Sequence, residues 1–478
     1  MTEQHLNFVA GRDIGADFTP NLNPSDLSDV IGEYASGTAE DVSAAVDAAR
    51  AAFPAWSRSG IAERHGILRR AADEILARKE DLGRLLAREE GKTLAEGIGE
   101  VARAGQIFDF FAGECLRLSG ETVPSVRPGI RIDVTREPLG VIGLITPWNF
   151  PIAIPAWKLA PALAYGNTVV LKPADLVPGC VWELVQILRR AGAPDGVVNL
   201  VMGRGSVVGQ AMLDHPGLDA ISFTGSVETG RRVALSSAEK GRKYQLEMGG
   251  KNPLVVLDDA DLDTAVSCAL NGAFYSTGQR CTASSRLIVT DGIHDRFVAA
   301  LREAMAGATV GHALDSATVI GPVASAPQLE QDIDYVRIGE AEGADLVFGG
   351  QRLNGETEGF FLSPALFTGC TSEMRIAREE IFGPLAAVLR ARDYDEALAM
   401  ANDTDFGLTA GICTTSLVHA EHFKRNAEAG MVMVNLPTAG VDFHVPFGGR
   451  KGSSFGPREQ GRYAAEFFTT VKTAYVLP

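Results

Sequence analysis

The part of this sequence with the clearest capacity for chemistry is a single cysteine in a run of small and polar residues. Residues 276–282 read Ser-Thr-Gly-Gln-Arg-Cys-Thr, so that Cys281 directly follows Arg280. Gly278 allows a sharp backbone turn, and small neighbours leave the sulfur approachable. Arg280 can help to hold a thiolate, which is the nucleophilic form of cysteine. Because a lone cysteine is more often a small core residue, this run indicates a nucleophile only if other catalytic groups accompany it.

Two upstream motifs carry groups that a cysteine nucleophile needs. Glu247 precedes Met-Gly-Gly-Lys-Asn-Pro, 34 positions before Cys281, and Asn149 lies in Pro-Trp-Asn-Phe-Pro. Alone, the first motif is typical of a surface carboxylate, and the second of a turn beside proline. Together with Cys281, they would supply a carboxylate base, an amide donor and a nucleophile.

Composition and charge argue against several classes of partner. The chain has 478 residues, of which 46% are hydrophobic and 22% charged, a balance typical of a globular protein of about two to four domains. Its 60 acidic and 44 basic residues give a net charge of −16. Such an acidic chain is a poor candidate for binding nucleic acid or an anionic membrane, so we expect neither partner. A local basic pocket for an anionic ligand is compatible with this balance.

The cysteines and the N-terminus predict a cytoplasmic protein. The six cysteines form no C-x-x-C pair, and neither they nor the eight histidines show the spacing of a metal site. We therefore expect free thiols, a reducing compartment and no bound metal. The first residues lack a basic region followed by an apolar run, and apolar runs elsewhere are too short to span a membrane.

Strands and helices alternate along the chain, as in a parallel α/β protein. A helix at 262–273 should lead to Cys281, and Thr38 with Asp41 should cap a helix at 39–53. Residues 467–476, rich in β-branched and aromatic side chains, suit an edge strand. The other predicted strands are 141–145, 168–171, 197–202, 218–224, 254–257, 286–289, 346–348 and 385–389, and residues 432–435 lead into a loop at 436–447. The other predicted helices are two within 61–91, then 93–118, 157–163, 180–191, 293–305 and 328–342.

The motifs around Asn149, Glu247 and Cys281 resemble those of the aldehyde dehydrogenase superfamily, and the resemblance covers nearly the whole chain. Glu-Ile-Phe-Gly-Pro at 380–384 and Pro-Phe-Gly-Gly at 446–449 match the family as well. The resemblance implies an α/β protein with a Rossmann-like NAD-binding domain, an α/β catalytic domain and a small β oligomerisation arm. The implied boundaries are 1–117 and 139–248 for the NAD-binding domain, 249–448 for the catalytic domain, and 118–138 with 449–478 for the arm and the C-terminal strand.

The resemblance also implies the oxidation of an aldehyde to a carboxylate. A hydride leaves the aldehyde carbon from a tetrahedral adduct, which the Cys281 thiolate would form and which then becomes a thioester. Asn149 and the backbone N–H of Cys281 would bind the oxyanion of that adduct. Glu247 would activate the water that hydrolyses the thioester. Lys158, nine residues after Asn149, is assigned to the same catalytic set.

The implied cofactor is NAD, with NADP tolerated. Residues 225–230 read Gly-Ser-Val-Glu-Thr-Gly between a predicted strand and helix, where backbone N–H groups favour a phosphate, although an ordinary glycine turn explains this pattern about as well. Asp175 stands where the family often has a glutamate, and its shorter carboxylate should still repel a 2′-phosphate that Lys172 would attract. The residues expected to bind the cofactor are Ile145, Thr146, Pro147, Trp148, Lys172, Ala174, Asp175, Gly205, Gly209, Phe223, Thr224, Gly225, Ser226, Gly230, Glu247, Met248, Gly249, Glu380 and Phe382.

The substrate is indicated by a resemblance to the subgroup of the family that oxidises α-ketoglutaric semialdehyde, carried by residues 144–158, 277–286 and 445–449. A substrate carboxylate needs a cation, and either Arg103 or Arg280 would bind it. The expected substrate-binding residues are Arg103, Phe150, Trp157, Arg280, Leu436 and Phe443. The alternatives are another semialdehyde, such as succinic or glutaric semialdehyde, a CoA-acylating relative, which the presence of Glu247 disfavours, and a catalytically silent structural or binding protein on this fold.

An oligomer is expected from the same resemblance. Residues 131–137 and the C-terminal strand match the family's β-arm and its partner, which are expected to pair between subunits. Such pairing satisfies otherwise open backbone groups of edge strands. We therefore predict a homodimer or a homotetramer.

Overall fold

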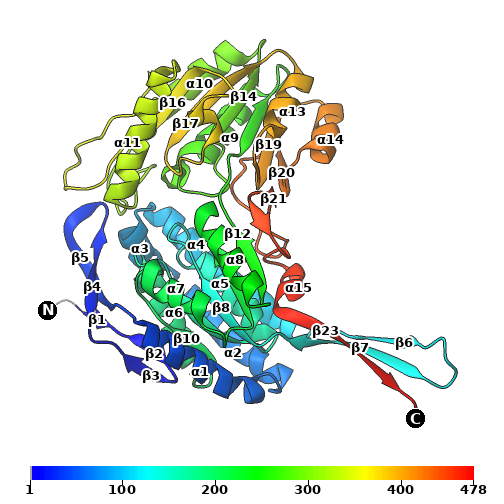
Figure 1. The fold of residues 1–478 in the computed structure, drawn as a ribbon. Coiled ribbons are helices and arrows are strands. Elements are labelled where there is room, and N and C mark those ends of the chain that lie inside the picture. Colours follow the sequence, from blue (N-terminus) through cyan, green and yellow to red (C-terminus); the bar gives the residue numbers. More distant parts are fainter. Residues whose placement is uncertain (1–2) are drawn as a thin grey trace.

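The computed structural model describes residues 3–478 and contains two large sheets flanked by helices, with a β-arm that projects from one of them (Figure 1). The predicted α/β fold class is confirmed. The predicted division into three domains with those boundaries stays a prediction. No helix within residues 3–478 is long and apolar enough to cross a membrane.

The first large sheet has eight strands in the order β22-β12-β11-β8-β9-β10-β2-β3, and the five strands from β12 to β10 are parallel. Parallel strands buried on both faces favour continuous apolar and β-branched runs, as in Val141–Ile145 and Thr168–Lys172. The strands are β2 (Asn7–Val9), β3 (Arg12–Ile14), β8 (Val141–Ile145), β9 (Thr168–Lys172), β10 (Val198–Leu200), β11 (Ala220–Thr224), β12 (Lys243–Glu247) and β22 (Ser454–Phe455).

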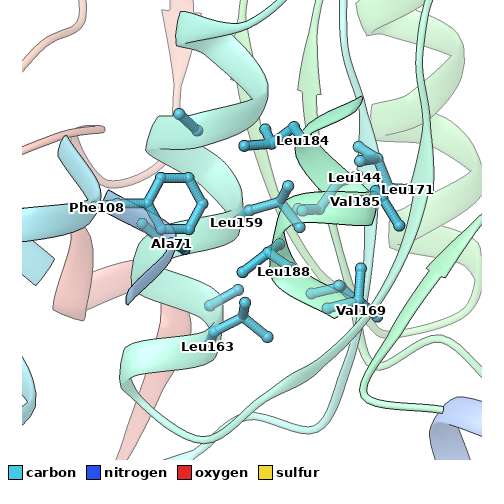
Figure 2. Close-up of a cluster of buried hydrophobic side chains, with 14 of the residues drawn as sticks. Ala71, Phe108, Leu144, Leu159, Leu163, Val169, Leu171, Leu184, Val185 and Leu188 are labelled. Atoms are coloured by element: carbon cyan, nitrogen blue, oxygen red, sulfur yellow. The ribbon is translucent and has the colours of Figure 1, made fainter. Parts of the chain in front are cut away.

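Amphipathic helices cover this sheet and enclose its core. Figure 2 shows part of that core, in which Leu159 of α5, Leu184 of α6 and Leu171 of β9, all fully buried, belong to one hydrophobic cluster. Thr38 and Asp41 form the predicted capping box at the first helix. The helices are α1 (Ala39–Trp56), α2 (Ile61–Ala77), α3 (Lys79–Glu90), α4 (Leu94–Cys115), α5 (Ala153–Ala164), α6 (Pro178–Arg190), the π-helix η1 (Gly205–Gly209), α7 (Gln210–Asp214) and α8 (Val227–Glu239).

The second large sheet has seven strands in the order β15-β16-β17-β14-β13-β19-β20. Its strands are β13 (Pro253–Val256), β14 (Arg286–Thr290), β15 (Asp345–Phe348), β16 (Ala365–Cys370), β17 (Leu385–Ala391), β19 (Thr409–Cys413) and β20 (Met431–Val434). Its helices are α9 (Leu262–Phe274), the 3-10 helix η2 (Tyr275–Gly278), α10 (His294–Ala306), α11 (Ala326–Ala341), α12 (Arg375–Arg378), α13 (Tyr394–Asn402) and α14 (Leu417–Asn426). Both the helix that leads to Cys281 and the strands that flank it were predicted.

The remaining elements form three small sheets and the C-terminal turn. An N-terminal sheet comprises β1 (Gln4–His5), β4 (Phe18–Asn23) and β5 (Asp26–Ala35), and a short pair comprises β18 (Phe406–Gly407) and β21 (Arg450–Lys451). The arm comprises β6 (Glu121–Pro124), β7 (Arg131–Pro138) and β23 (Thr469–Val476), and η3 (Arg462–Ala464) and α15 (Ala465–Phe468) precede its last strand.

The arm corrects two predictions. Phe467 and Phe468 belong to helix α15 and are buried, so the terminal strand begins at Thr469 and not at residue 467. The predicted pairing of the C-terminal strand with residues 131–137 occurs within the chain, where β23 runs antiparallel to β7 from Thr469 opposite Pro138 to Val476 opposite Arg131. A strand that returns directly to its own arm needs no second subunit to satisfy that edge.

Candidate active site

A cavity of about 340 Å³ lies where the two large sheets meet, and Cys281 is on its wall. One side is formed by helices α4 and α5, which pack with the first sheet. The other side is formed by the loop after η2 and by residues 437, 439–441 and 447. The cavity is therefore shared between the two halves of the fold.

The loop that carries Cys281 has the sharp turn that its sequence predicts. Ser276, Thr277 and Gly278 all adopt positive φ, at 50°, 56° and 65°. A side chain at Gly278 would place its Cβ 2.2 Å from the carbonyl oxygen of Gly383, so this position requires glycine. Glu96 accepts hydrogen bonds from the backbone N–H and the hydroxyl of Ser276, at 2.9 and 2.8 Å, and ties the turn to α4.

Asn149 lies in the loop after β8, with its side chain 3% exposed. Its Nδ2 donates to the carbonyl oxygen of Gln279 at 3.0 Å. The amide is thereby directed from the first half of the fold at the loop of Cys281, where an oxyanion donor is needed.

Glu247 ends β12 and is buried, and Ser454 Oγ donates to its Oε2 at 2.5 Å. Burial raises the pKa of Glu247 well above its usual range, and the charge of Glu459 raises it further. A carboxylate with a raised pKa is a stronger base, which suits proton abstraction from water near neutral pH.

Lys158 lies behind this carboxylate and does not contact the cysteine. Its fully buried Nζ donates to Ser222 Oγ at 2.7 Å and forms an ion pair with Glu459. Glu459 was not predicted, because a carboxylate between an arginine and a glutamine carries no local signal. The structure thus places Lys158 in a buried cluster whose acidic member acts on Glu247.

The pKa of the Cys281 thiol is raised to about 12, mainly by burial and then by the charges of Glu380 and Glu247. Proton removal must therefore accompany or precede nucleophilic attack. Burial also raises the pKa of Glu380 to about 7, and Glu380 Oε1 accepts a hydrogen bond from the backbone N–H of Gly250 at 2.9 Å. The ionisation of Glu380 therefore contributes to the raised pKa of the Cys281 thiol.

The predicted cofactor residues gather along one edge of the first sheet, at the carboxyl ends of its parallel strands. Ser226 is the N-cap of the 13-residue helix α8, directly after β11. The buried hydroxyls of Thr146 and Thr224 contact no hydrogen-bond partner within the described residues 3–478, so they are available to a polar ligand. The ring of Trp148 meets that of Phe382 edge to face at 5.3 Å. Unpaired hydroxyls, a helix N-terminus and this strand edge fit a dinucleotide.

Two further predicted cofactor residues, Lys172 and Asp175, lie at or just after the end of β9. Lys172 is buried at the end of β9, and its Nζ donates to the carbonyl oxygen of Pro173 at 2.8 Å. Asp175 is exposed and lines a smaller cavity of about 60 Å³ together with Ser36, Met202 and Arg204. Arg204 was not predicted. The remaining predicted cofactor residues lie on the same edge or at its junction with the second sheet: Ile145, Pro147, Ala174, Gly205, Gly209, Phe223, Gly225, Gly230, Met248 and Gly249.

Four of the six predicted substrate residues line the large cavity, and two do not. Arg103, Phe150, Trp157 and Arg280 are on its wall. Leu436 is 59% exposed and outside that wall, where Pro437 takes its place, while Phe443 contacts Phe110. Wall residues that the sequence did not indicate include Lys92, Glu96, Glu100, Asn271 and Ser276. Among the residues described, no group of three or more side chains is arranged to hold a metal ion.

Comparison with known proteins gives one family. The sequence pattern described as the aldehyde dehydrogenase family matches residues 10–474. The chain is 45% identical to an α-ketoglutaric semialdehyde dehydrogenase from Bacillus subtilis, over 100% of this chain and 99% of that protein. It is similar to the solved structure of betaine aldehyde dehydrogenase from Staphylococcus aureus in complex with NAD⁺, with a TM-score of 0.96 and 34% identity over 99% of this chain and 95% of the other. It is also similar to an NADP-dependent enzyme from Escherichia coli, with a TM-score of 0.95 and 36% identity over 99% and 98% of the two chains.

The effect of Glu380 on the thiol gives a testable pH dependence. Replacing Glu380 by Gln removes a negative charge that disfavours the thiolate, so the pKa of Cys281 should fall and its alkylation by iodoacetamide at pH 8 should become roughly two- to tenfold faster. The measurement is the alkylation rate of Cys281 as a function of pH, followed by mass spectrometry. The exposed Glu373→Gln variant is the matched control and should leave the profile unchanged. A Glu380→Gln profile that coincides with the wild type would contradict the assignment.

Proposed function

This chain belongs to the aldehyde dehydrogenase family, and from that premise we propose that it oxidises α-ketoglutaric semialdehyde to 2-oxoglutarate, with Cys281 as nucleophile. The predicted family is confirmed by the match over residues 10–474. The observation that carries the choice of substrate is the buried, almost unpaired guanidinium of Arg103 on the wall that also holds Cys281. The name of the Bacillus subtilis relative supports the same substrate.

The first half of the reaction uses the thiol and the amide. The Cys281 thiolate adds to the aldehyde carbon, and the Asn149 amide donates to the resulting oxyanion. When bound, a nicotinamide dinucleotide would supply the hydride acceptor for this carbon, and the adduct on Cys281 would become a thioester. The residues at the strand edge, with the α8 N-terminus and Lys172, would hold that dinucleotide.

The second half uses the buried carboxylates. Glu247 takes a proton from a water that attacks the thioester carbon, and the Cys281 thiolate leaves as the carboxylate product forms. Glu459 repels the charge on Glu247 and thereby increases its basicity, while the Lys158 ammonium neutralises Glu459. Lys158 accordingly acts in this proposal through Glu459 and not on the oxyanion.

The charges on the cavity wall favour Arg103 over Arg280 as the partner of a substrate carboxylate. Arg280 is already occupied, since its Nη2 lies 3.1 Å from Glu96 Oε1 and 2.8 Å from Ser276 Oγ. Arg103 has one long contact, from Nη2 to Gln460 Oε1 at 3.4 Å, and its buried Nε contacts no acceptor within the described chain. Burial lowers the pKa of Arg103, and the charges of Glu100 and Asp442 oppose that shift. A substrate carboxylate would add the direct hydrogen-bonded partner that Nε lacks within residues 3–478.

Replacing Arg103 by Ala tests this assignment. A hydrogen-bonded charge pair contributes about 1.5–3 kcal/mol, so KM for α-ketoglutaric semialdehyde should rise roughly tenfold to a hundredfold. KM for an uncharged aldehyde of similar length should change by less than about threefold, because it makes no such pair. Steady-state kinetics with both aldehydes give the result. Equal increases for the two substrates would remove Arg103 from the carboxylate site.

We further propose that NAD is preferred and that NADP is tolerated. The Asp175 carboxylate lies where it would repel a 2′-phosphate, and Lys172 and Arg204 would attract one. The similar solved structures include one with NAD⁺ and one of an NADP-dependent enzyme, which supports use of both.

The Arg204→Ala variant separates these contributions. Because an exposed charge contributes about 0.2–1 kcal/mol, kcat/KM with NADP should fall roughly twofold to fivefold, and kcat/KM with NAD should stay unchanged. The measurement is kcat/KM with each nucleotide at one saturating aldehyde concentration. An equal loss with both nucleotides would place Arg204 outside the 2′-phosphate site.

The arm supports a homo-oligomer. Strand β23 is one of the two edge strands of the arm (Figure 1). Its exposed side chains include Val471 at 56% and Tyr475 at 60% exposure. A long, exposed strand with apolar side chains is a pairing surface, and we propose that a second copy of the chain covers it. The assembly would be a dimer, or a tetramer built from dimers.

Multi-angle light scattering at micromolar concentration measures this directly. The expected mass corresponds to two or four copies of the chain. A monomeric mass at that concentration would contradict the proposed assembly and leave β23 as an exposed edge.

A further inference from the structure

Lys92, which belongs to no catalytic motif, lies between the substrate cavity and the loop of Asn149. Its side chain is 2% exposed, and its Nζ donates to the backbone carbonyl oxygen of Asn149 and, at 2.8 Å, to Glu100 Oε2. The ammonium also lies 3.6 Å from the centre of the Phe150 ring, which favours a cation. The lysine thus holds two consecutive residues of the oxyanion loop.

Glu100 holds the same loop from its other end. Its second oxygen, Oε1, accepts hydrogen bonds from the backbone N–H groups of Ile152 and Ala153, each at 3.1 Å. These groups are at the start of α5, where a carboxylate is favoured by unpaired N–H groups. The ion pair of Lys92 and Glu100 therefore contacts the backbone on both sides of Phe150.

The ion pair is buried, with both side chains 2% exposed and Lys92 Nζ 2.8 Å from Glu100 Oε2. Glu90, whose Oε2 accepts from the backbone N–H of Lys92 at 3.0 Å, has its pKa raised to about 8 by burial. Glu100 is therefore the direct counter-ion of Lys92. A buried pair of this kind restricts geometry more than it adds stability, so its consequence should be sought in what it positions.

We propose that Lys92, together with Glu100, is a positioning residue that fixes the Asn149 amide for oxyanion binding. The backbone carbonyl of Asn149 is held by the ammonium, and its side-chain Nδ2 is directed to the carbonyl of Gln279 at 3.0 Å. With both ends of the residue fixed, the donor is in place before the oxyanion forms, which is the condition for a large rate effect. This inference rests on the proposed acyl chemistry of Cys281.

A second role is available to Lys92, because its side chain also lines the cavity. If the Lys92 ammonium contacted the substrate carboxylate, its removal would raise KM for charged aldehydes only. A positioning residue acts on the rate of oxyanion formation, whichever compound acylates Cys281. The two roles are therefore separable by choice of acyl donor.

The test uses p-nitrophenyl acetate, which needs no nucleotide and carries no carboxylate. Attack of the Cys281 thiolate on its carbonyl expels p-nitrophenolate and leaves an acetyl thioester, through an oxyanion that Asn149 would bind. Stopped-flow release of p-nitrophenolate gives the acylation rate of the full-length protein. The variants are Lys92→Met, Asn149→Ala and the double variant, with the exposed Lys424→Met as the matched control.

Lys92→Met should slow acylation by about 10²-fold, as removal of an oxyanion donor does, and should add less than about a threefold loss in the Asn149→Ala background. If the Lys92→Met chain does not fold, the Lys92→Met/Glu100→Gln variant, which leaves no unpaired charge, carries the same test with the same expectation. If Lys92→Met slowed acylation as much in the Asn149→Ala background as in the wild type, the inference would be overturned. Normal acylation combined with a raised KM for α-ketoglutaric semialdehyde would also overturn it, and would assign Lys92 to the substrate. Wild-type acylation without any aldehyde oxidation would count against the proposed function and not against the positioning role.

Discussion

The hydrogen bond from Asn149 Nδ2 to the carbonyl of Gln279 spans the junction on which the whole site depends. The proposed nucleophile, Cys281, belongs to the seven-stranded half of the fold, and the proposed oxyanion donor and base belong to the eight-stranded half. The two halves are joined beside this bond by α4, since Leu94 N–H donates to the carbonyl of Ala313 at 2.9 Å and Glu96 accepts from Ser276. Chemistry at Cys281 therefore requires the correct alignment of two separately built sheets.

Burial of charge is the second constraint, because each buried ionised side chain needs a partner, and these partners determine what each group can do. Burial, and then the charge of Glu459, raise the pKa of Glu247, while the Lys158 ammonium forms an ion pair with Glu459 and lowers that pKa. On the cavity wall, Lys92 pairs with Glu100 and Arg280 pairs with Glu96. These pairs leave Arg103 as the cation that can bind a ligand, which is compatible with the proposed acidic substrate in a protein with a strongly negative net charge.

The elements that the sequence predicted best are those with strong local patterns. Val141–Ile145 and Thr168–Lys172 are apolar and β-branched runs, and both are central strands. Lys243–Glu247 alternates polar and apolar residues without such a run, so its strand was missed although it carries the base. The aromatic pair Phe467-Phe468 suggested a strand, but burial against the core places it in a short helix. The nucleophile, base and amide donor are predictions from sequence motifs. Glu459 and Lys92, in contrast, contact Lys158 and Asn149, which lie 301 and 57 residues away, and no local sequence pattern indicates such contacts.

The central claim, oxidation of an acidic semialdehyde at Cys281, is tested most directly by kcat/KM of the wild-type protein with NAD across four aldehydes. These are α-ketoglutaric, succinic and glutaric semialdehydes and one uncharged aldehyde of similar length. The account predicts the highest value for α-ketoglutaric semialdehyde and at least about a tenfold lower value for the uncharged aldehyde, as expected for one charge-assisted contact to Arg103. Equal values for the charged and uncharged aldehydes, or no NADH formation with any of them, would contradict it.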